Sequence, residues 1–186
     1  GMNGTLHMTP ETKEPVIIGL GGLIGSGKTT IARVLTQRLL RHDKTSTVMS
    51  FATPLKEMMK TMLVEAGFHP HVAHAWVHER IYRDVKRDVL GGNTMRWALQ
   101  TLGTEWGRDL LHEELWAWIA EGRARRAPYD VVIFDDVRFG SEAKQMDYTF
   151  RLIRSAVEEA DDHPSEGMDY YATDIPNDGA VEDVAD

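Results

Sequence analysis

The chain has 186 residues, 42% of them hydrophobic and 27% charged, which is typical of one globular domain with a sizeable core. Its net charge of −8 disfavours a surface that binds a nucleic-acid polymer, and no apolar run approaches the about 20 residues that span a membrane. The absence of cysteine excludes disulfides and thiolate metal sites, and it fits a protein of the reducing cytoplasm.

The first third of the chain predicts a strand, a helix and a second strand. "VIIGL" (16–20) is a short apolar run, and "TTIARVLTQRLL" (29–40) has the apolar spacing of an amphipathic helix. "TSTVMSFA" (45–52) predicts the second strand. A helix should begin directly afterwards, with Thr53 as its N-cap and Pro54 at its first position.

The middle of the chain is predicted to be mainly helical. Residues 55–90 favour helix with a break at "AGFHP", and residues 95–120 favour one or two helices after a loop at 91–94. The basic stretch "GRARRAP" (122–128) is interpreted as a solvated loop. Four tryptophans at helical spacings are interpreted as core residues rather than base-stacking platforms: Trp97, Trp106, Trp116 and Trp118. Three histidines on one helical face are interpreted as surface or interface residues rather than metal ligands: His71, His74 and His78.

The last third predicts two further strands and a short helix. "YDVVIFDDVRF" (129–139) has a continuous apolar run that ends in acids, which is typical of a central parallel strand. "SEAKQM" (141–146) predicts a short helix and "YTFRLIR" (148–154) a strand, whereas the acidic residues 155–186 give no secure prediction. Because strands alternate with helices, we expect a three-layer α/β/α fold with a parallel central sheet and ligands at the carboxyl ends of the strands.

A phosphate-binding motif lies between the first strand and the first helix. Residues 22–29, "GLIGSGKT", fit G-x-x-x-x-G-K-[ST], and a strand before and a helix after supply the required context. The glycines allow backbone N–H groups to turn toward a β-phosphate, and the helix adds the positive end of its dipole. Lys28 should bridge the β- and γ-phosphates, and the Thr29 hydroxyl should help to hold Mg²⁺. The predicted ATP-binding residues are Gly22, Gly25, Ser26, Gly27, Lys28, Thr29 and Thr30.

A carboxylate partner for the metal should lie at the end of a neighbouring strand. "VVIFDD" supplies Asp135 and Asp136 there. Adjacent residues point in different directions, so we expect only one of the two to serve Mg²⁺.

The absence of one motif and the distribution of the basic residues narrow the class of reaction. A GTPase should carry Asn-Lys-x-Asp, which is absent, and a polynucleotide kinase should show a basic groove. All 21 Lys and Arg precede residue 155, and residues 1–154 carry a net charge of +3, so a site for anions must be assembled there. We therefore predict a small-molecule kinase whose core is formed by 15–53 and 128–186 and whose helical insert, 54–127, binds the acceptor. The insert supplies arginines that suit a phosphorylated acceptor: Arg80, Arg83, Arg87, Arg96 and Arg108.

Several blocks of the sequence together point to one family. "SFATPLKEM" (50–58), "RWALQTLGTEWGRDLLHEELWAW" (96–118), "DVRFGSEA" (136–143) and "HPSE" (163–166) accompany the phosphate-binding motif. In this combination the chain resembles the bacteriophage-type deoxynucleoside monophosphate kinases over roughly residues 16–180. More distantly it looks like phosphomevalonate kinase and dephospho-coenzyme A kinase.

The resemblance implies transfer of the γ-phosphoryl of ATP, with Mg²⁺, to a deoxynucleoside 5′-monophosphate in the cytoplasm, or the host cytoplasm if a phage encodes the protein. It favours Asp136 over Asp135 as the metal-side acid and places Arg138 where the two phosphates converge. Arg96, Gln100 and Arg108 fall in the block that looks like the monophosphate site, where Gln100 could read a base edge. Ser50 and Lys56 lie just past the second strand, on the acceptor side.

Some positions depart from the family pattern. The family usually has a small polar residue at the position of Asp135, and "VKRDVLGGNT" lacks the expected Lys-Glu pair and proline, which affects Lys86 and Arg87. No Lys or Arg follows Arg154, so we expect Arg154 and Arg138 to neutralise the transferring phosphoryl, with His163 as an additional donor. Asn177 is a candidate on the adenine side.

Two alternatives stay open at this stage. The acceptor could be dephospho-coenzyme A or phosphomevalonate, or the chain could bind nucleotide for regulation without transferring phosphate. We expect no membrane or nucleic-acid polymer as partner, and a homodimer is compatible with the sequence.

Overall fold

The computed structural model describes residues 13–22, 27–153 and 173–176. Its main sheet has five parallel strands in the order β2-β5-β1-β6-β7. The strands are β1 (Val16–Gly21), β2 (Ser46–Met49), β5 (Val131–Val137), β6 (Tyr148–Ile153) and β7 (Thr173–Pro176). This confirms the predicted parallel α/β fold. The strand β7 adds a neighbour to β6 that the acidic tail did not suggest.

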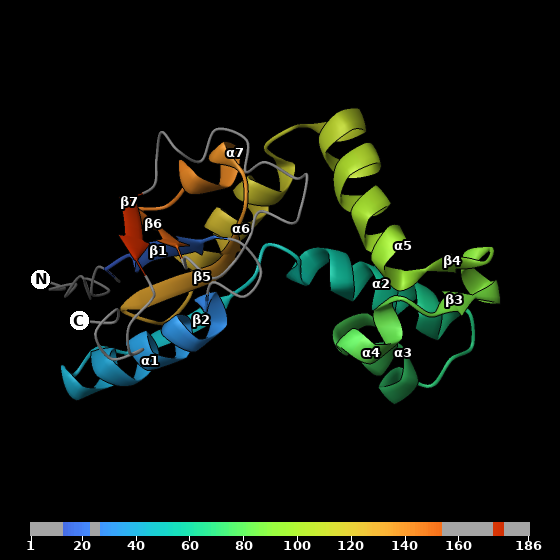
Figure 1. Ribbon diagram of the computed structural model, residues 1–186, viewed down its shortest axis with the longest axis horizontal. Helices are drawn as coiled ribbons and strands as arrows, with labels where there is room; N and C mark the ends of the chain where they lie inside the picture. Colours follow the sequence, from blue (N-terminus) through green and yellow to red (C-terminus); the bar gives the residue numbers. More distant parts are fainter. Residues whose placement is uncertain (1–12, 23–26, 154–172, 177–186) are drawn as a thin grey trace, which may run out of the picture.

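Helices cover the sheet on both faces, as Figure 1 shows. Val132 and Phe134 of β5 point into a core shared with α6 (Leu115–Arg125) and α7 (Gly140–Ala143). Val131 and Ile133 point the other way, into a core shared with α1 (Lys28–Arg41). Because successive side chains of a strand face opposite sides, a central strand that is covered twice must be apolar at every position. The continuous run "VVIF" meets that requirement.

The region between β2 and α6 forms a helical body that lies to one side of the sheet (Figure 1). It contains α2 (Thr53–Glu65), α3 (Pro70–His78), α4 (Arg80–Arg83) and α5 (Met95–Thr101). Its core is separate from the two cores of the sheet and is built from Met59, Leu63, Ala73, Val77 and Met95. We call this region, residues 53–111, the helical segment.

The helical segment ends in a π-helix, η2 (Leu102–Leu111), which directly continues α5. It also contains a short hairpin of β3 (Lys86–Arg87) and β4 (Asn93–Thr94), with a 3₁₀ turn η1 (Asp88–Leu90) between the two strands. Gly91 and Gly92 have φ of 65° and 80°, a backbone conformation that favours glycine, so "GGNT" closes a hairpin and is not a simple loop.

Several local predictions need correction. Helix α2 begins at Thr53 with Ala52 as its N-cap, one residue earlier than predicted. The basic stretch 122–128 is a loop only at 126–128, because α6 continues to Arg125, which pairs with Asp147 of the α7–β6 connection. Of the four tryptophans only Trp116 is in the core; Trp97, Trp106 and Trp118 are about half exposed. Helical spacing identified the helices but not the face that is buried.

Within the described part of the chain, no helix is both long and apolar enough to cross a membrane.

Candidate functional site

The phosphate-binding motif connects β1 to α1 at the carboxyl edge of the sheet. Gly22 and Gly27 have φ of 133° and 94°, so both need glycine, and Lys28 is the first residue of α1. The Lys28 ammonium donates a hydrogen bond to the Gly22 carbonyl at 2.5 Å and so reaches back across the turn. Burial, followed by the charge of Arg138, lowers the pKa of Lys28, which places these two predicted catalytic cations near each other. Gly25 and Ser26 lie outside the described residues.

The two acids at the end of β5 face opposite sides of the sheet. Asp135 lies on the α1 side, where it lines one surface hollow together with Thr29. Burial raises its pKa, as does the neighbouring charge of Asp136, whereas Lys28 and Lys56 oppose the rise. The structure therefore brings Asp135, and not Asp136, beside the predicted metal-binding hydroxyl.

Asp136 lies on the other side and holds the start of the helical segment. Its carboxylate accepts hydrogen bonds from the Ser50 hydroxyl at 2.5 Å and from the backbone N–H groups of Phe51 and Ala52 at 3.1 and 3.3 Å. Burial raises the pKa of Asp136, and these hydrogen bonds act against that rise. Both carboxylate oxygens are thus committed to the turn that leads from β2 into α2.

Lys56 of α2 is close enough to these acids for their charges to act on it. Burial and the charge of Arg83 lower its pKa, whereas the charges of Asp136 and Asp135 raise it. Lys56 therefore interacts with the acids at the end of β5 and with an arginine of α4 at the same time. The acceptor-side role of Lys56 stays a prediction.

Arg83, one of the arginines predicted to suit a phosphorylated acceptor, is partly buried in α4. Its guanidinium donates to the His78 carbonyl at 3.4 Å, and its buried Nε has no hydrogen-bond partner among the described residues. Burial lowers its pKa, and the charges of Arg96 and Arg80 lower it further. The signal in the sequence was the spacing of Arg80 and Arg83, which places two cations one helical turn apart.

Arg96, at the start of α5, forms a bidentate ion pair within the helical segment. Its Nε and NH2 groups donate to the two carboxylate oxygens of Asp84 at 2.7 and 3.2 Å. This pairing lowers the pKa of Asp84 and raises that of Arg96. Gln100, one turn along α5, is exposed.

Arg108 connects the other end of the helical segment to the sheet. Its guanidinium lies 4.0 Å from the centre of the Phe139 ring and 3.5 Å from the Glu142 carboxylate. Glu142 is only 3% exposed, and its Oε2 also accepts from the backbone N–H groups of Arg138 and Phe139 at 2.7 and 3.1 Å. Burial raises the pKa of Glu142 to about 7. We did not select Glu142 from the sequence, where it appears as an ordinary glutamate of a short helix.

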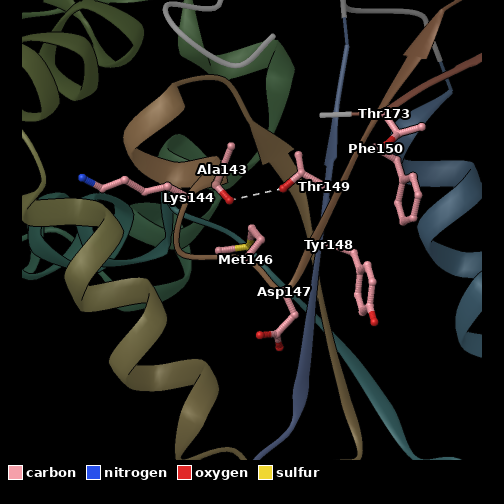
Figure 2. A pocket seen from close by; sticks show the side chains of 8 residues that line it. All are labelled: Ala143, Lys144, Met146, Asp147, Tyr148, Thr149, Phe150 and Thr173. Atoms are coloured by element: carbon pink, nitrogen blue, oxygen red, sulfur yellow. Dashed lines mark hydrogen bonds between the residues drawn. The ribbon is translucent and has the colours of Figure 1, made fainter. Parts of the chain in front are cut away.

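The helix α7, which carries Glu142, is fixed by its surroundings. Figure 2 shows the hollow beside it, where the Thr149 hydroxyl donates to the Ala143 carbonyl at 3.3 Å. Lys144, the next residue, pairs with Glu114 at the start of α6. Asp147, which also lines this hollow, accepts from the backbone N–H of Ile17 at 2.7 Å. The hollow is thus built around contacts that hold α7 to β1, β6 and α6.

The π-helix that carries Arg108 is fixed by Trp116. This side chain is 4% exposed, and its Nε1 donates to the Gly103 carbonyl at 2.9 Å. A Cβ on Gly107 would lie 2.5 Å from the same Nε1, so only glycine allows this close approach. The glycines of "LGTEWG" therefore serve packing against α6, and π-helical turns are frequent at functional sites.

Not every predicted residue can be placed. Arg154, His163 and Asn177 lie outside the described residues. Arg138 is exposed at the end of β5, and Thr30 is in the first turn of α1. The remaining candidates gather in two places, around the acids of β5 and within the helical segment.

The strand order, the glycine turn ahead of Lys28 and the acids at the end of β5 define the α/β fold of the P-loop kinases. No model of a protein family matches the chain. Individual proteins do match it. A protein of Acanthamoeba polyphaga mimivirus, named as a candidate deoxynucleotide monophosphate kinase, is 32% identical over 174 residues, which cover 81% of this chain and 80% of its own.

A shorter match agrees with the first. The deoxynucleoside-5′-monophosphate kinase of Escherichia phage T5 is 40% identical over 57 residues, or 31% of this chain and 23% of its own. The chain therefore belongs to the deoxynucleotide monophosphate kinase family, a family of phosphotransferases.

Proposed function

We propose that this protein transfers the γ-phosphoryl of ATP to a deoxynucleoside 5′-monophosphate, giving ADP and the deoxynucleoside diphosphate. The observation that carries the proposal is the position of Lys28 and Lys56 around the acids at the end of β5. One lysine belongs to the phosphate-binding turn, the other to the arginine-bearing helical segment, and the charges of Asp135 and Asp136 act on both. Donor and acceptor phosphates would meet between them.

The donor side would consist of the glycine turn and the start of α1. Gly22 and Gly27 have the positive φ that lets backbone N–H groups line a cradle for phosphate, and Gly25 and Ser26 belong to the same motif. Lys28 would bind the β- and γ-phosphates, next to Thr29 and Thr30 at the positive end of the helix.

Mg²⁺ fits the oxygen donors on the α1 side of the sheet. Thr29 and Asp135 line the same hollow there, and hydroxyl and carboxylate oxygens are the ligands that this ion prefers. When bound, Mg²⁺ would neutralise charge on the ATP phosphates. Asp136 is the residue that the family pattern favours, but its two oxygens already accept three hydrogen bonds. We therefore assign the metal-side role to Asp135 and a positioning role to Asp136.

The acceptor side would consist of Lys56, Arg83 and the arginines of the helical segment. Arg83 has a buried guanidinium nitrogen without a partner among the described residues, and Arg96 presents the bidentate fork that suits phosphate. Ser50, which is hydrogen-bonded to Asp136, lies at the entrance to this side. Gln100 would read the base edge and Arg108 would add charge from the opposite end of the segment.

In-line transfer needs no covalent enzyme intermediate. An oxygen of the acceptor phosphate forms a bond to the γ-phosphorus while the bond from that phosphorus to the bridging oxygen of ADP breaks. The acceptor oxygen is already ionised near neutral pH, so no strong general base is required. Lys28, Arg138 and Arg154 would bind the phosphoryl oxygens and stabilise the charge that develops on them.

The test is ADP release from ATP·Mg²⁺ with dAMP, dGMP, dCMP, dTMP and GMP. Lys28→Ala serves as the blank, because it removes the cation that would bind the transferred phosphate. Release that depends on a deoxynucleotide and is lost in the blank is the expected result. If none of the five nucleotides stimulates ADP release, the proposal is refuted. ADP release with dephospho-coenzyme A or phosphomevalonate instead would identify a different acceptor.

A further inference from the structure

The ion pair between Asp84 and Arg96 has the geometry of a phosphate complex. Arg96 uses two guanidinium nitrogens on two oxygens, at 2.7 and 3.2 Å, and this parallel arrangement is how arginine binds phosphate and carboxylate alike. Arg96 is also the residue that our proposed function assigns to the acceptor phosphate. The two guanidinium nitrogens, which we call the Arg96 fork, are therefore occupied by the Asp84 carboxylate of the same chain.

Asp84 lies between two arginines. It follows Arg83 directly in the sequence and caps the C-terminal end of α4, while Arg96 reaches it from α5. The charges of both arginines lower its pKa, after the hydrogen bonds from Arg96. Arg83 and Arg96 in turn repel each other, and Asp84 opposes that repulsion. A single carboxylate thus supplies the negative charge that a phosphate would bring to these two cations.

The pair is exposed enough to be exchanged. The side chains of Asp84 and Arg96 are 69% and 48% exposed, and exposed ion pairs contribute little net stability and weaken in salt. A phosphate monoester with a charge close to −2 at neutral pH competes well with one carboxylate of charge −1. The buried Nε of Arg83 lacks a partner among the described residues and would gain one.

We propose that Asp84 is a placeholder for the acceptor phosphate: it occupies the Arg96 fork until the acceptor binds, and the phosphate then takes its place between Arg83 and Arg96. Asp84 is therefore a specificity residue for the proposed function. A nucleoside without a phosphate cannot displace it, and a phosphorylated acceptor binds at the cost of breaking one weak ion pair.

The experiment measures binding without turnover, so that it does not depend on phosphoryl transfer. Isothermal titration calorimetry with dTMP and with inorganic phosphate, at about 50 mM salt and without ATP, compares the wild type with Asp84→Asn. Because the competing charge is gone, the Kd for dTMP should fall about two- to fivefold, the range expected for release of one exposed ion pair.

A matched control removes a charge nearby without touching the fork. Asp88→Asn lowers the negative charge of the same segment by one, and Asp88 is exposed in the η1 turn. It should change the Kd much less than Asp84→Asn does. In the Arg96→Ala background Asp84→Asn should bring no gain, because the fork is absent.

Either of two results would overturn the proposal that Asp84 is a placeholder. Weaker binding in Asp84→Asn would mean that Asp84 orients Arg96 for the ligand, and an effect no larger than that of Asp88→Asn would mean that only overall charge matters. If the protein binds dTMP or phosphate with the expected pattern but never phosphorylates a deoxynucleotide, the placeholder stands and the proposed function fails. If it phosphorylates deoxynucleotides but the variants do not show the expected binding pattern, the proposed function stands and the placeholder role of Asp84 fails.

Discussion

Arg108 and Glu142 join the helical segment to the sheet through one ion pair, 3.5 Å long, at a carboxylate that is almost completely buried. The same carboxylate accepts from the backbone of Arg138 and Phe139, so it fixes the end of the "DVRF" block and the arginine of the "LGTEWGR" block together. These two blocks are far apart in the sequence and carry the strongest family resemblance. The ion pair gives a physical reason why they occur in one protein.

The stability of the fold should depend on the protonation of Glu142. Its pKa is about 7 in the folded protein and 4.5 as its ordinary value, so between these pH values the folded state binds more protons than the unfolded state. Stability from this group therefore falls as the pH rises from 4.5 to 7 and is constant above. The change amounts to at most about 3.5 kcal/mol.

Glu142→Gln isolates this contribution, because glutamine does not titrate. Urea unfolding of both proteins at several pH values from 4.5 to 8 should show the wild type losing stability relative to the variant as the pH rises. Asp135 and Asp136 also have raised pKa values and are present in both proteins; because the charge of Asp136 acts on Glu142, the difference between the proteins includes that coupling. Parallel curves would contradict the prediction.

Gly107→Ala should disturb the π-helix. A Cβ at this position would lie 2.5 Å from the Trp116 ring, which is itself buried and hydrogen-bonded to Gly103, so neither side can move freely. We expect a loss of about 1–3 kcal/mol of stability, the usual cost of overpacking a core. Thermal unfolding measures this loss.

Gly122→Ala is the matched control. Gly122 is also helical, but a Cβ there would meet only the flexible end of Arg126, at 3.2 Å. Since alanine has the higher helix propensity by about 1 kcal/mol, this variant should be as stable as the wild type or more stable. Equal losses in the two variants would show that the Trp116 contact is unimportant.

The sequence predicted the sheet well and the site only in outline. Apolar runs and the glycine motif depend on neighbouring residues, so β1, α1, β2, β5 and β6 could be recognised without tertiary information. The contacts of Glu142 and Asp84 could not, because each depends on the approach of segments distant in the chain. A buried glutamate and an exposed one look alike in sequence, and so do a paired and an unpaired arginine.

The choice between the two acids of β5 illustrates the same limit. Family resemblance pointed to Asp136, whereas strand geometry places Asp135 beside Thr29 and commits Asp136 to the β2–α2 turn. Alternation along a strand indicates that the two differ, but not which face carries the helix α1. The proposed division of the chain into a kinase core and an acceptor-binding insert likewise remains a prediction.

Asp135→Ala should therefore affect the Mg²⁺ requirement of the activity, whereas Asp136→Ala should affect the stability of the fold. Removing Asp135 also removes its repulsion with Asp136, so stability should be retained, while the Mg²⁺ concentration for half-maximal activity should rise on the order of 10–100-fold. Removing Asp136 leaves the Ser50 hydroxyl and the N–H group of Phe51 without an acceptor, whereas the N–H of Ala52 keeps its hydrogen bond to the Ser50 hydroxyl oxygen at 3.1 Å.

Each such unsatisfied group costs about 1–3 kcal/mol when buried, so Asp136→Ala should lower the melting temperature clearly. Thermal unfolding and Mg²⁺ titration of the activity, carried out on both variants, separate the two roles. A stable Asp136→Ala protein with a large Mg²⁺ requirement would reverse the assignment and return the metal to Asp136.

Lys56→Ala and Arg83→Ala should weaken the acceptor side specifically. Both cations are partly buried and lie in mutual repulsion, which an anionic acceptor would relieve. A hydrogen bond to a charged group contributes about 1.5–3 kcal/mol, so each variant should raise the KM for the deoxynucleoside monophosphate roughly 10–100-fold. The KM for ATP should change little, because the donor phosphates are held by the turn at Lys28. Lys60→Ala, one turn further along α2, is the control, and an equal rise in its acceptor KM would show that Lys56 contributes only general charge.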